Sequence, residues 1–396
     1  MNIEHRDIDK FIPYGEALRG FVNQKFITPP VLQSILKERG IFVLNADRDY
    51  MVPIVQTLLL SPTEFDKIRD AFARKEDNEK KISREISFSS NATLYQSDIM
   101  QMNVEDFLKR QLPTCKIKQA IRFVQTDNNP NHLTAKFTII RNDINTAITN
   151  NNTVINKNIE TAINNNNTVI NNEFSGSVEI INENGKGAIR ITHTSPETKD
   201  LAEYIVKNQI RQYKDKGLLK EDVNPQKILF STFTNTTRFV FFFRLTTKIE
   251  NNGIFTFVDI KDISIKPQDE CVLPAEILWM ENIQRLIISG KSLNEKAFMK
   301  EEKFYCNLEL WSIEATFEYD YNGQKGYVCI CFGFPDYNSK GGNAEFEVNI
   351  KSLVPEKTLS AKEKRDLKSK LLSLMDNQKL TVYSNFLNYL NNRDAK

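Results

Sequence analysis

No part of the sequence is suited to crossing a membrane. A transmembrane helix needs about 18 or more consecutive apolar residues, and the 396-residue chain contains no such run. The opening residues, MNIEHRDIDKF, also lack the apolar core of an export signal. We therefore expect a cytoplasmic protein that has no membrane partner.

Cysteine and histidine are both scarce. The five cysteines are Cys115, Cys271, Cys306, Cys329 and Cys331. Their odd number and irregular spacing do not fit a disulfide framework or a zinc finger. The three histidines, His5, His132 and His193, have no i, i+4 partner of the kind that binds a metal on a helix. We expect reduced cysteines and no bound metal, with Cys329 and Cys331 packed as soft core residues.

The signatures of several common enzyme classes are missing. The sequence has no G-x-x-x-x-G-K-[ST] phosphate loop, no strand-linked G-x-G-x-x-G and no G-x-S-x-G turn. This excludes the usual routes to nucleotide hydrolysis and serine-hydrolase chemistry. We therefore expect no cofactor.

One short motif allows a catalytic alternative. Asp259 and Lys261 are two residues apart at a strand end, so their side chains share one face of the sheet. With Glu250 as an upstream acid, they could hold Mg²⁺ and stabilise a developing anion. The motif resembles the D/E-x-K part of restriction-type nuclease sites, but no Pro-Asp precedes it at the usual distance. Since D-x-K is common on solvated strands, we favour a binding protein over a metal-dependent nuclease.

The composition is that of a globular protein with several domains. Hydrophobic residues make up 40% and charged residues 26%, which is enough material for a core. The formal net charge is only +2, so any basic surface must come from local clustering. We predict a helical binding or docking domain at 1–85, an α+β domain at 86–225 and a β-rich domain with C-terminal helices at 226–396.

The first 85 residues show helical spacing of apolar residues. One helix begins with Thr28 as its cap and ends at Gly40. An extended loop follows at 41–49, and a further helix runs from about Met51 to Leu60, with Pro53 tolerable only in its first turn. This order is similar to the helix–extended loop–helix plan of SAP-type DNA-binding modules. On this plan, the residues that would contact nucleic acid are Lys37, Arg39 and Arg48. The alternative is a small helical docking domain.

The rest of the chain is predicted to be α+β, with a mostly antiparallel sheet and flanking helices. The charged run at 74–84 is interpreted as a linker, and 187–192 as a strand. Residues 228–266 alternate like strands, with a hairpin turn at Asn252-Gly253. A second hairpin is predicted at 304–334, turning at Asn322-Gly323. A strand at 344–350 and a capping box from Ser360 to Glu363 complete the pattern.

A well-marked helix carries the second group of candidate binding residues. Ser195 is its expected cap, Pro196 follows, and Gly217 lies just past its end. Lys207, Arg211 and Lys214 fall at i, i+4 and i+7, which makes one cationic stripe. Such cations can neutralise nucleic-acid phosphates, although an ordinary solvated face has the same pattern.

An asparagine-rich duplication interrupts the second predicted domain. The segment at 146–156 recurs almost unchanged at 161–171, inside a tract covering 142–172. Two copies are too few for a solenoid. We interpret the tract as a surface insertion with no assigned role.

The N-terminal block resembles a known family. The resemblance rests on 11–18 (FIPYGEAL), 26–28 (FIT) through 37–42 (KERGIF), 58–65 (LLLSPTEF) and 75–78 (KEDN). In the overall pattern of these segments, the block is similar to the B component of a two-gene, GAPS-type prokaryotic antiphage operon. The resemblance implies a bacterial defence protein that senses or presents nucleic acid while a nuclease encoded by the adjacent gene cuts. It carries over no catalytic residue.

We therefore expect a non-catalytic, nucleic-acid-binding subunit of a hetero-oligomeric defence complex, with DNA favoured over RNA. The alternatives are the metal-dependent nuclease described above and a structural adaptor that does not bind nucleic acid.

Overall fold

The computed structural model describes residues 14–23, 27, 29–44, 47–65, 67–68, 78–89, 92–141, 173–247, 249, 253–268, 272–283 and 285–394. Several features singled out from the sequence lie outside these ranges. They are the asparagine-rich tract, His5, Thr28, Glu250, Asn252 and Cys271.

Three short helices and a further helical turn form the N-terminal domain. The helices are α1 (Gly15–Val22), α2 (Pro29–Glu38) and α3 (Arg48–Thr57), and 62–65 are also helical. The predicted end of α2 is confirmed, since Gly40 has a φ of +70°. The prediction for α3 was wrong: the Asp47 side chain caps a helix that begins at Arg48, so Pro53 lies beyond the first turn.

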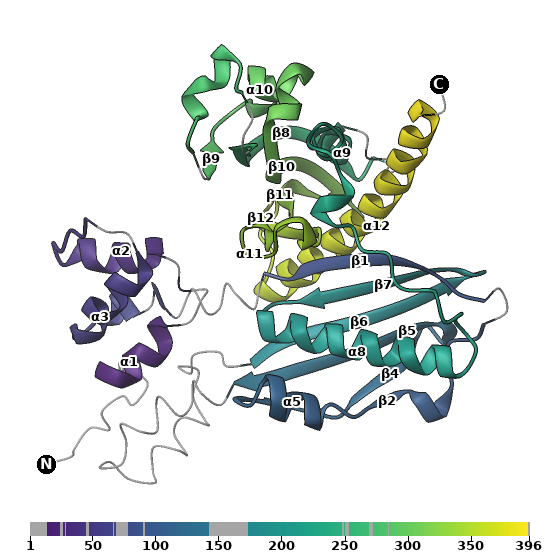
Figure 1. Ribbon diagram of the computed structural model, residues 1–396. Coiled ribbons are helices and arrows are strands. Elements are labelled where there is room, and N and C mark those ends of the chain that lie inside the picture. Colours follow the sequence, from purple (N-terminus) through teal and green to yellow (C-terminus); the bar gives the residue numbers. More distant parts are fainter. Residues whose placement is uncertain are drawn as a thin grey trace, which may run out of the picture.

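The body is built on a single antiparallel sheet, which confirms the predicted α+β class. Over the described ranges it has 12 strands in the order β2-β4-β5-β6-β7-β1-β12-β11-β10-β8-β9, and β3 pairs with β5 (Figure 1). The strands are β1 (Lys80–Ser87), β2 (Gln101–Met102), β3 (Cys115–Ile117), β4 (Ile121–Thr126), β5 (Asn129–Arg141), β6 (Glu173–Glu183), β7 (Lys186–His193), β8 (Phe255–Pro267), β9 (Leu286–Ser289), β10 (Leu308–Tyr321), β11 (Gln324–Gly333) and β12 (Glu347–Pro355).

Helices cover parts of both faces of this sheet. The longer ones are α8 (Pro196–Asp215), α9 (Asn235–Thr247) and α12 (Ala361–Asp394), and the shorter ones are α5 (Glu105–Gln111), α10 (Ala297–Lys300) and α11 (Tyr337–Lys340). The 3-10 turns are η2 (Ser97–Ile99), η4 (Phe230–Thr232), η5 (Ala275–Met280), η6 (Leu293–Glu295), η7 (Glu302–Asn307) and η8 (Gly341–Asn343). None of the helices in the described ranges is both long and apolar enough for a membrane span.

β1 joins the two halves of the sheet. It pairs with β7 along its whole length but with β12 only through Lys80↔Asn349 and Lys81↔Val348. The interpretation of 74–84 as a linker was therefore wrong from Lys80 onward. The Arg84 charge of this strand can be buried because Glu345, just before β12, binds it at 2.6 Å.

Local capping signals predicted several elements correctly. Ser195 caps α8 by accepting a hydrogen bond from the Thr198 N–H at 3.2 Å. Asn322 and Gly323 both have positive φ, as a tight hairpin turn between β10 and β11 requires. The Ser360 hydroxyl and the Glu363 carboxylate cap each other's backbone N–H groups at the start of α12.

The phenylalanine-rich run before residue 248 is a helix, so the strand prediction there was wrong. In α9, Phe239, Phe241 and Phe242 are buried together with Leu245. Because α9 packs against both α12 and β10, it is apolar around most of its circumference. Gly253 consequently lies between a helix and β8, and not in a hairpin between two strands.

Candidate nucleic-acid interface

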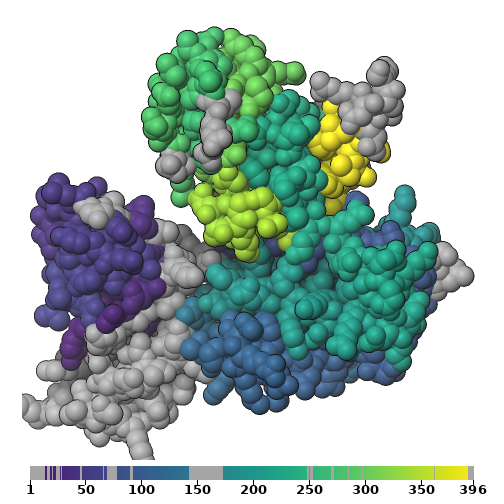
Figure 2. Space-filling model, in the orientation of Figure 1, coloured from purple at the N-terminus to yellow at the C-terminus, as the bar shows by residue number. Residues whose placement is uncertain are grey.

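The exposed side of α8 borders a cavity of about 1010 Å³. α5 and the segment at 221–227 form its other walls, and α5 and α8 lie side by side (Figures 1 and 2). Its lining residues are Arg84, Phe107, Gln111, Asp200, Glu203, Tyr204, Val206, Lys207, Ile210, Arg211, Lys214, Asp215, Glu221, Asn224, Pro225 and Lys227. We call this cavity the α8 groove.

The structure brings the three predicted cations of α8 together in this groove. Lys207 and Arg211 are exposed, and within the described ranges their side chains make no hydrogen bond or ion pair. The Lys214 ammonium is held by the Glu221 carbonyl at 2.7 Å and by Asn224. Lys227 adds a fourth cation that helical periodicity could not reveal, since it lies in the loop after α8.

Four acidic side chains also line the groove: Asp200, Glu203, Asp215 and Glu221. Of these, Glu203 is neutralised by an ion pair. Arg84 lies at the buried floor of the groove and binds both Glu203 and Glu345. Burial lowers the pKa of the Arg84 guanidinium, but the hydrogen bonds that it donates to these carboxylates outweigh that effect and raise the pKa above its ordinary value. The same contact keeps Glu203 ionised, with its charge balanced. Lys207 and Arg211 are therefore the side chains most available to an anion.

Two aromatic rings lie beside these cations. Phe107 of α5 and Tyr204 of α8 stack with their ring centroids 4.4 Å apart and an interplanar angle of 23°. Both side chains are partly exposed and line the groove. Aromatic rings next to cations are typical of surfaces that bind single-stranded nucleic acid.

The N-terminal cations predicted to bind nucleic acid are differently placed. The Arg39 guanidinium binds the Glu64 carboxylate through two contacts of 2.6 Å and also donates to the Leu59 carbonyl. Arg48 donates to the Val22 carbonyl at 2.8 Å. These two side chains therefore connect parts of the helical domain, whereas Lys37 is exposed on α2. Figure 1 places this domain at one end of the sheet, so it does not share the α8 groove.

Removing the Glu64 charge should loosen the helical domain. The hydrogen bond from Arg39 is the largest cause lowering the pKa of Glu64 from 4.5 to about 2. Because the folded pKa is depressed, this stabilisation is present above pH 4.5 and is lost as the pH falls toward 2. For Glu64→Gln we expect amide exchange of 58–65 at neutral pH to be about tenfold faster, measured by hydrogen–deuterium exchange. Exchange equal to wild type at pH 7 would contradict this role.

Two residues of the alternative nuclease site, Asp259 and Lys261, make contacts within the fold. The Asp259 carboxylate accepts hydrogen bonds from the Ser292 N–H, at 3.0 and 3.2 Å, and lies 3.3 Å from the Lys261 ammonium. Glu250 lies outside the described residues. Across those residues no group of three His, Cys, Asp or Glu side chains is placed to hold a metal ion. The nuclease assignment therefore stays a prediction.

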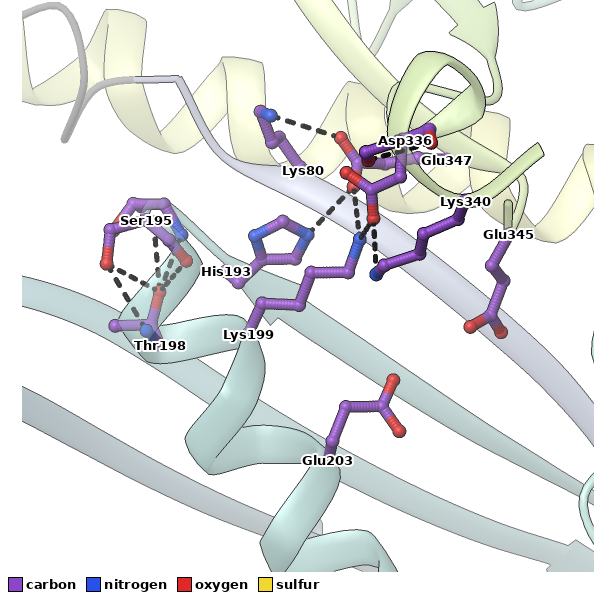
Figure 3. A network of polar contacts seen from close by, with 12 residues as sticks. Lys80, His193, Ser195, Thr198, Lys199, Glu203, Asp336, Lys340, Glu345 and Glu347 are labelled. Carbon is purple, nitrogen blue, oxygen red and sulfur yellow. Dashed lines mark hydrogen bonds and ion pairs between the residues drawn. The ribbon is translucent and has the colours of Figure 1, made fainter. Parts of the chain in front are cut away.

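A network of buried ion pairs lies at the N-terminal end of α8 (Figure 3). Glu347 is 2% exposed and is bound by His193 at 3.0 Å and Lys80 at 3.2 Å. Lys199 connects it to Asp336, at distances of 3.6 and 3.0 Å. Burial would raise the pKa of Glu347, but the nearby positive charges lower it well below its ordinary value. These contacts join β1, β7 and α8 to β12 and the start of α11, so they hold the two halves of the sheet together.

Comparison with protein families gave a match to the helical domain. Residues 16–78 match the GAPS4b protein N-terminal domain. This GAPS4b-like domain spans α1 to the residues just before β1, and the match agrees with the family resemblance seen in the sequence. The comparison with curated proteins gave no match.

Among solved structures, the chain is similar to DynU16, a protein of the dynemicin biosynthetic locus. The two share 9% sequence identity over 68% of this chain and 79% of DynU16, with a TM-score of 0.14. At this TM-score the likeness does not indicate a common fold.

Proposed function

We propose that the protein is a non-catalytic, nucleic-acid-binding subunit of a bacterial antiphage defence complex, and that it acts with a nuclease encoded by an adjacent gene. The GAPS4b-like domain supports the role in defence. The observation that carries the binding role is the α8 groove, where Lys207 and Arg211 lie unpaired beside the Phe107–Tyr204 stack, within the described part of the chain. Exposed cations supply most of the affinity of non-specific nucleic-acid binding.

The GAPS4b-like domain would contribute mainly protein contacts. Its Arg39 and Arg48 are occupied within the domain, so they are less available to phosphates than Lys207 and Arg211. Phe42, Leu44 and Leu59 are instead 80%, 108% and 73% exposed, and exposed apolar side chains on a small domain are typical of protein interfaces. We assign this domain to contacts with the nuclease partner.

Co-expression with the product of the adjacent gene tests the assembly. The full chain and its neighbour should co-purify, and substitution of both Phe42 and Leu44 by Ser should reduce recovery of the neighbour. The matched control is Val272→Ser, which changes a side chain that is 91% exposed on the body. Recovery that is unaffected by the Phe42 and Leu44 changes would contradict the assignment to this domain.

Fluorescence anisotropy with labelled DNA and RNA tests the binding role directly. We expect binding at low salt that weakens steeply as salt is added, with DNA bound more tightly than RNA. If neither nucleic acid bound at low salt, the structural adaptor would be the better description.

A further inference from the structure

A second cavity, of about 600 Å³, lies on the face of the sheet opposite α8. Its floor is formed by β5, β6 and β7, and the N-terminal half of α12 forms one wall. Figure 1 shows where these elements lie in the fold. The side chains on this face alternate with those that pack under α8, such as Phe137 and Val178. The cavity is within the usual size range of small-molecule sites.

Hydroxyl groups are concentrated in this cavity. β5, β6 and α12 contribute two each, β7 contributes one and Thr194 follows it: Thr134, Thr138, Ser175, Ser177, Thr192, Thr194, Ser369 and Ser373. Three cations, Lys81, Lys136 and Arg190, line it together with two carboxylates, Glu79 and Glu179. Hydroxyls, lysine and arginine are the side chains that usually bind phosphate oxygens.

Lys81 distinguishes this cavity from an ordinary solvated sheet face. It is 8% exposed, and its ammonium donates to the Ser373 hydroxyl at 2.6 Å. Across the described residues no carboxylate oxygen lies within 4.0 Å of it. Asp376, Glu179 and Glu79 attract it only from a longer distance. A buried ammonium without a direct ion pair is costly, and side chains of this kind are normally paired.

The neighbouring carboxylates are already occupied by other groups. Asp376, which is fully buried behind the cavity, is bound by Lys379 at 2.7 Å and by Ser83. Glu179 is bound by Arg190 at 3.2 Å and by His132 at 2.5 Å. The buried Arg190 Nε has no hydrogen-bond acceptor and lies 4.0 Å from the Asp376 carboxylate. Lys81 and Arg190 both line the cavity, and neither carboxylate is held by Lys81 within ion-pair distance.

We propose that this cavity binds a phosphate-bearing small molecule of nucleotide size, with Lys81 and Arg190 binding the phosphate. The hydroxyls of β5–β7 and α12 would supply further hydrogen bonds to its oxygens. The site is separate from the α8 groove and does not depend on the function proposed for that groove. The bound phosphate would make the direct ion pair with Lys81 that the surrounding carboxylates do not make.

Lys81→Met is the decisive variant, because methionine fills a similar volume without a charge. Thermal unfolding and titration calorimetry of the full chain with inorganic phosphate and with ATP should show binding and a higher Tm for wild type. In Lys81→Met we expect affinity for both to fall at least tenfold. Without phosphate, this variant should have a Tm equal to or higher than wild type, because it removes a buried charge that makes no direct ion pair. A lysine kept only for structure would instead give a lower Tm.

Two further variants separate this site from the α8 groove. Lys136→Gln, at an exposed position in the cavity, should weaken ATP binding several-fold without affecting folding. Lys207→Gln should bind ATP as wild type does. Absence of binding by wild type at millimolar phosphate and ATP would overturn the proposal, as would equal binding by Lys81→Met. If a 12-residue oligonucleotide bound in a Lys81-dependent way and ATP did not, the phosphate would come from a nucleic-acid backbone and the small-molecule proposal would be wrong.

Discussion

The double variant Lys207→Glu/Arg211→Glu is expected to weaken nucleic-acid binding by about tenfold or more at low salt, and to flatten its salt dependence. Both side chains are exposed on α8 and line the α8 groove. Each phosphate contact that is lost should reduce the slope of log K against log salt by about 0.9 for duplex DNA. The change therefore affects the slope as well as the affinity at one salt concentration.

The measurement is fluorescence anisotropy at several salt concentrations between about 50 and 200 mM, the range over which phosphate contacts have large effects. The matched control is Lys296→Glu/Lys300→Glu, which makes the same charge change at exposed positions on the other half of the sheet. If both double variants lost affinity equally, the effect would come from net charge, and the α8 groove would not be the binding surface. If the slope of log K against log salt were unchanged in the α8 variant, this too would show that the α8 groove is not the binding surface.

Arg84→Met is expected to cause the largest loss of stability, about 3–5 kcal/mol. The guanidinium is 2% exposed and contacts the Glu345 carboxylate at 2.6 and 2.7 Å, in addition to Glu203. Glu345 is itself 7% exposed, so the substitution would leave a buried carboxylate whose remaining ion pair among the described residues is with Lys227, at 3.6 Å. The cost arises from this uncompensated charge more than from the loss of the contact itself.

Urea denaturation monitored by circular dichroism would measure this change. Lys303→Met provides the control, because Lys303 also contacts two carboxylates but is 54% exposed. Exposed pairs contribute little, so the control should unfold at almost the same urea concentration as wild type. Since Arg84 joins β1 to the segment before β12, we also expect the variant to unfold in two steps, one for each half of the sheet. A single transition at the wild-type midpoint would show that this contact does not hold the halves together.

Local signals in the sequence predicted local structure correctly. The Ser195 cap, the Asn322-Gly323 turn and the Ser360 capping box depend on residues only a few positions apart, and all three were predicted. The stripe of Lys207, Arg211 and Lys214 follows from the same reasoning, because the periodicity of α8 sets which side chains share a face.

The errors came from tertiary contacts. In α9, a helix packed on several sides has apolar residues at almost every position, so its sequence resembles a buried strand. A local signal was present, because the Thr234 hydroxyl accepts a hydrogen bond from the Thr237 N–H at 3.2 Å and so caps this helix. For β1, the charges of Lys81 and Arg84 looked like those of a linker, and only distant residues show why they are buried.

The candidate site was predictable only in part for the same reason. Lys227, Phe107 and the cavity behind Lys81 depend on segments that are far apart in the sequence. No periodicity within one helix or strand indicates that such residues meet.

The position of β1 in the sheet has a consequence for biosynthesis. β1 begins at Lys80, yet one of its neighbours, β12, begins at Glu347, and Ser83 bonds to Asp376 across 293 positions of the chain. Pairings so distant in sequence slow folding, since a long loop must close before any contact forms. During synthesis, the backbone groups of β1 that pair with β12 therefore have no hydrogen-bond partner until more than half of the polypeptide has been translated. We expect nascent chains that stop before α12 to recruit chaperones.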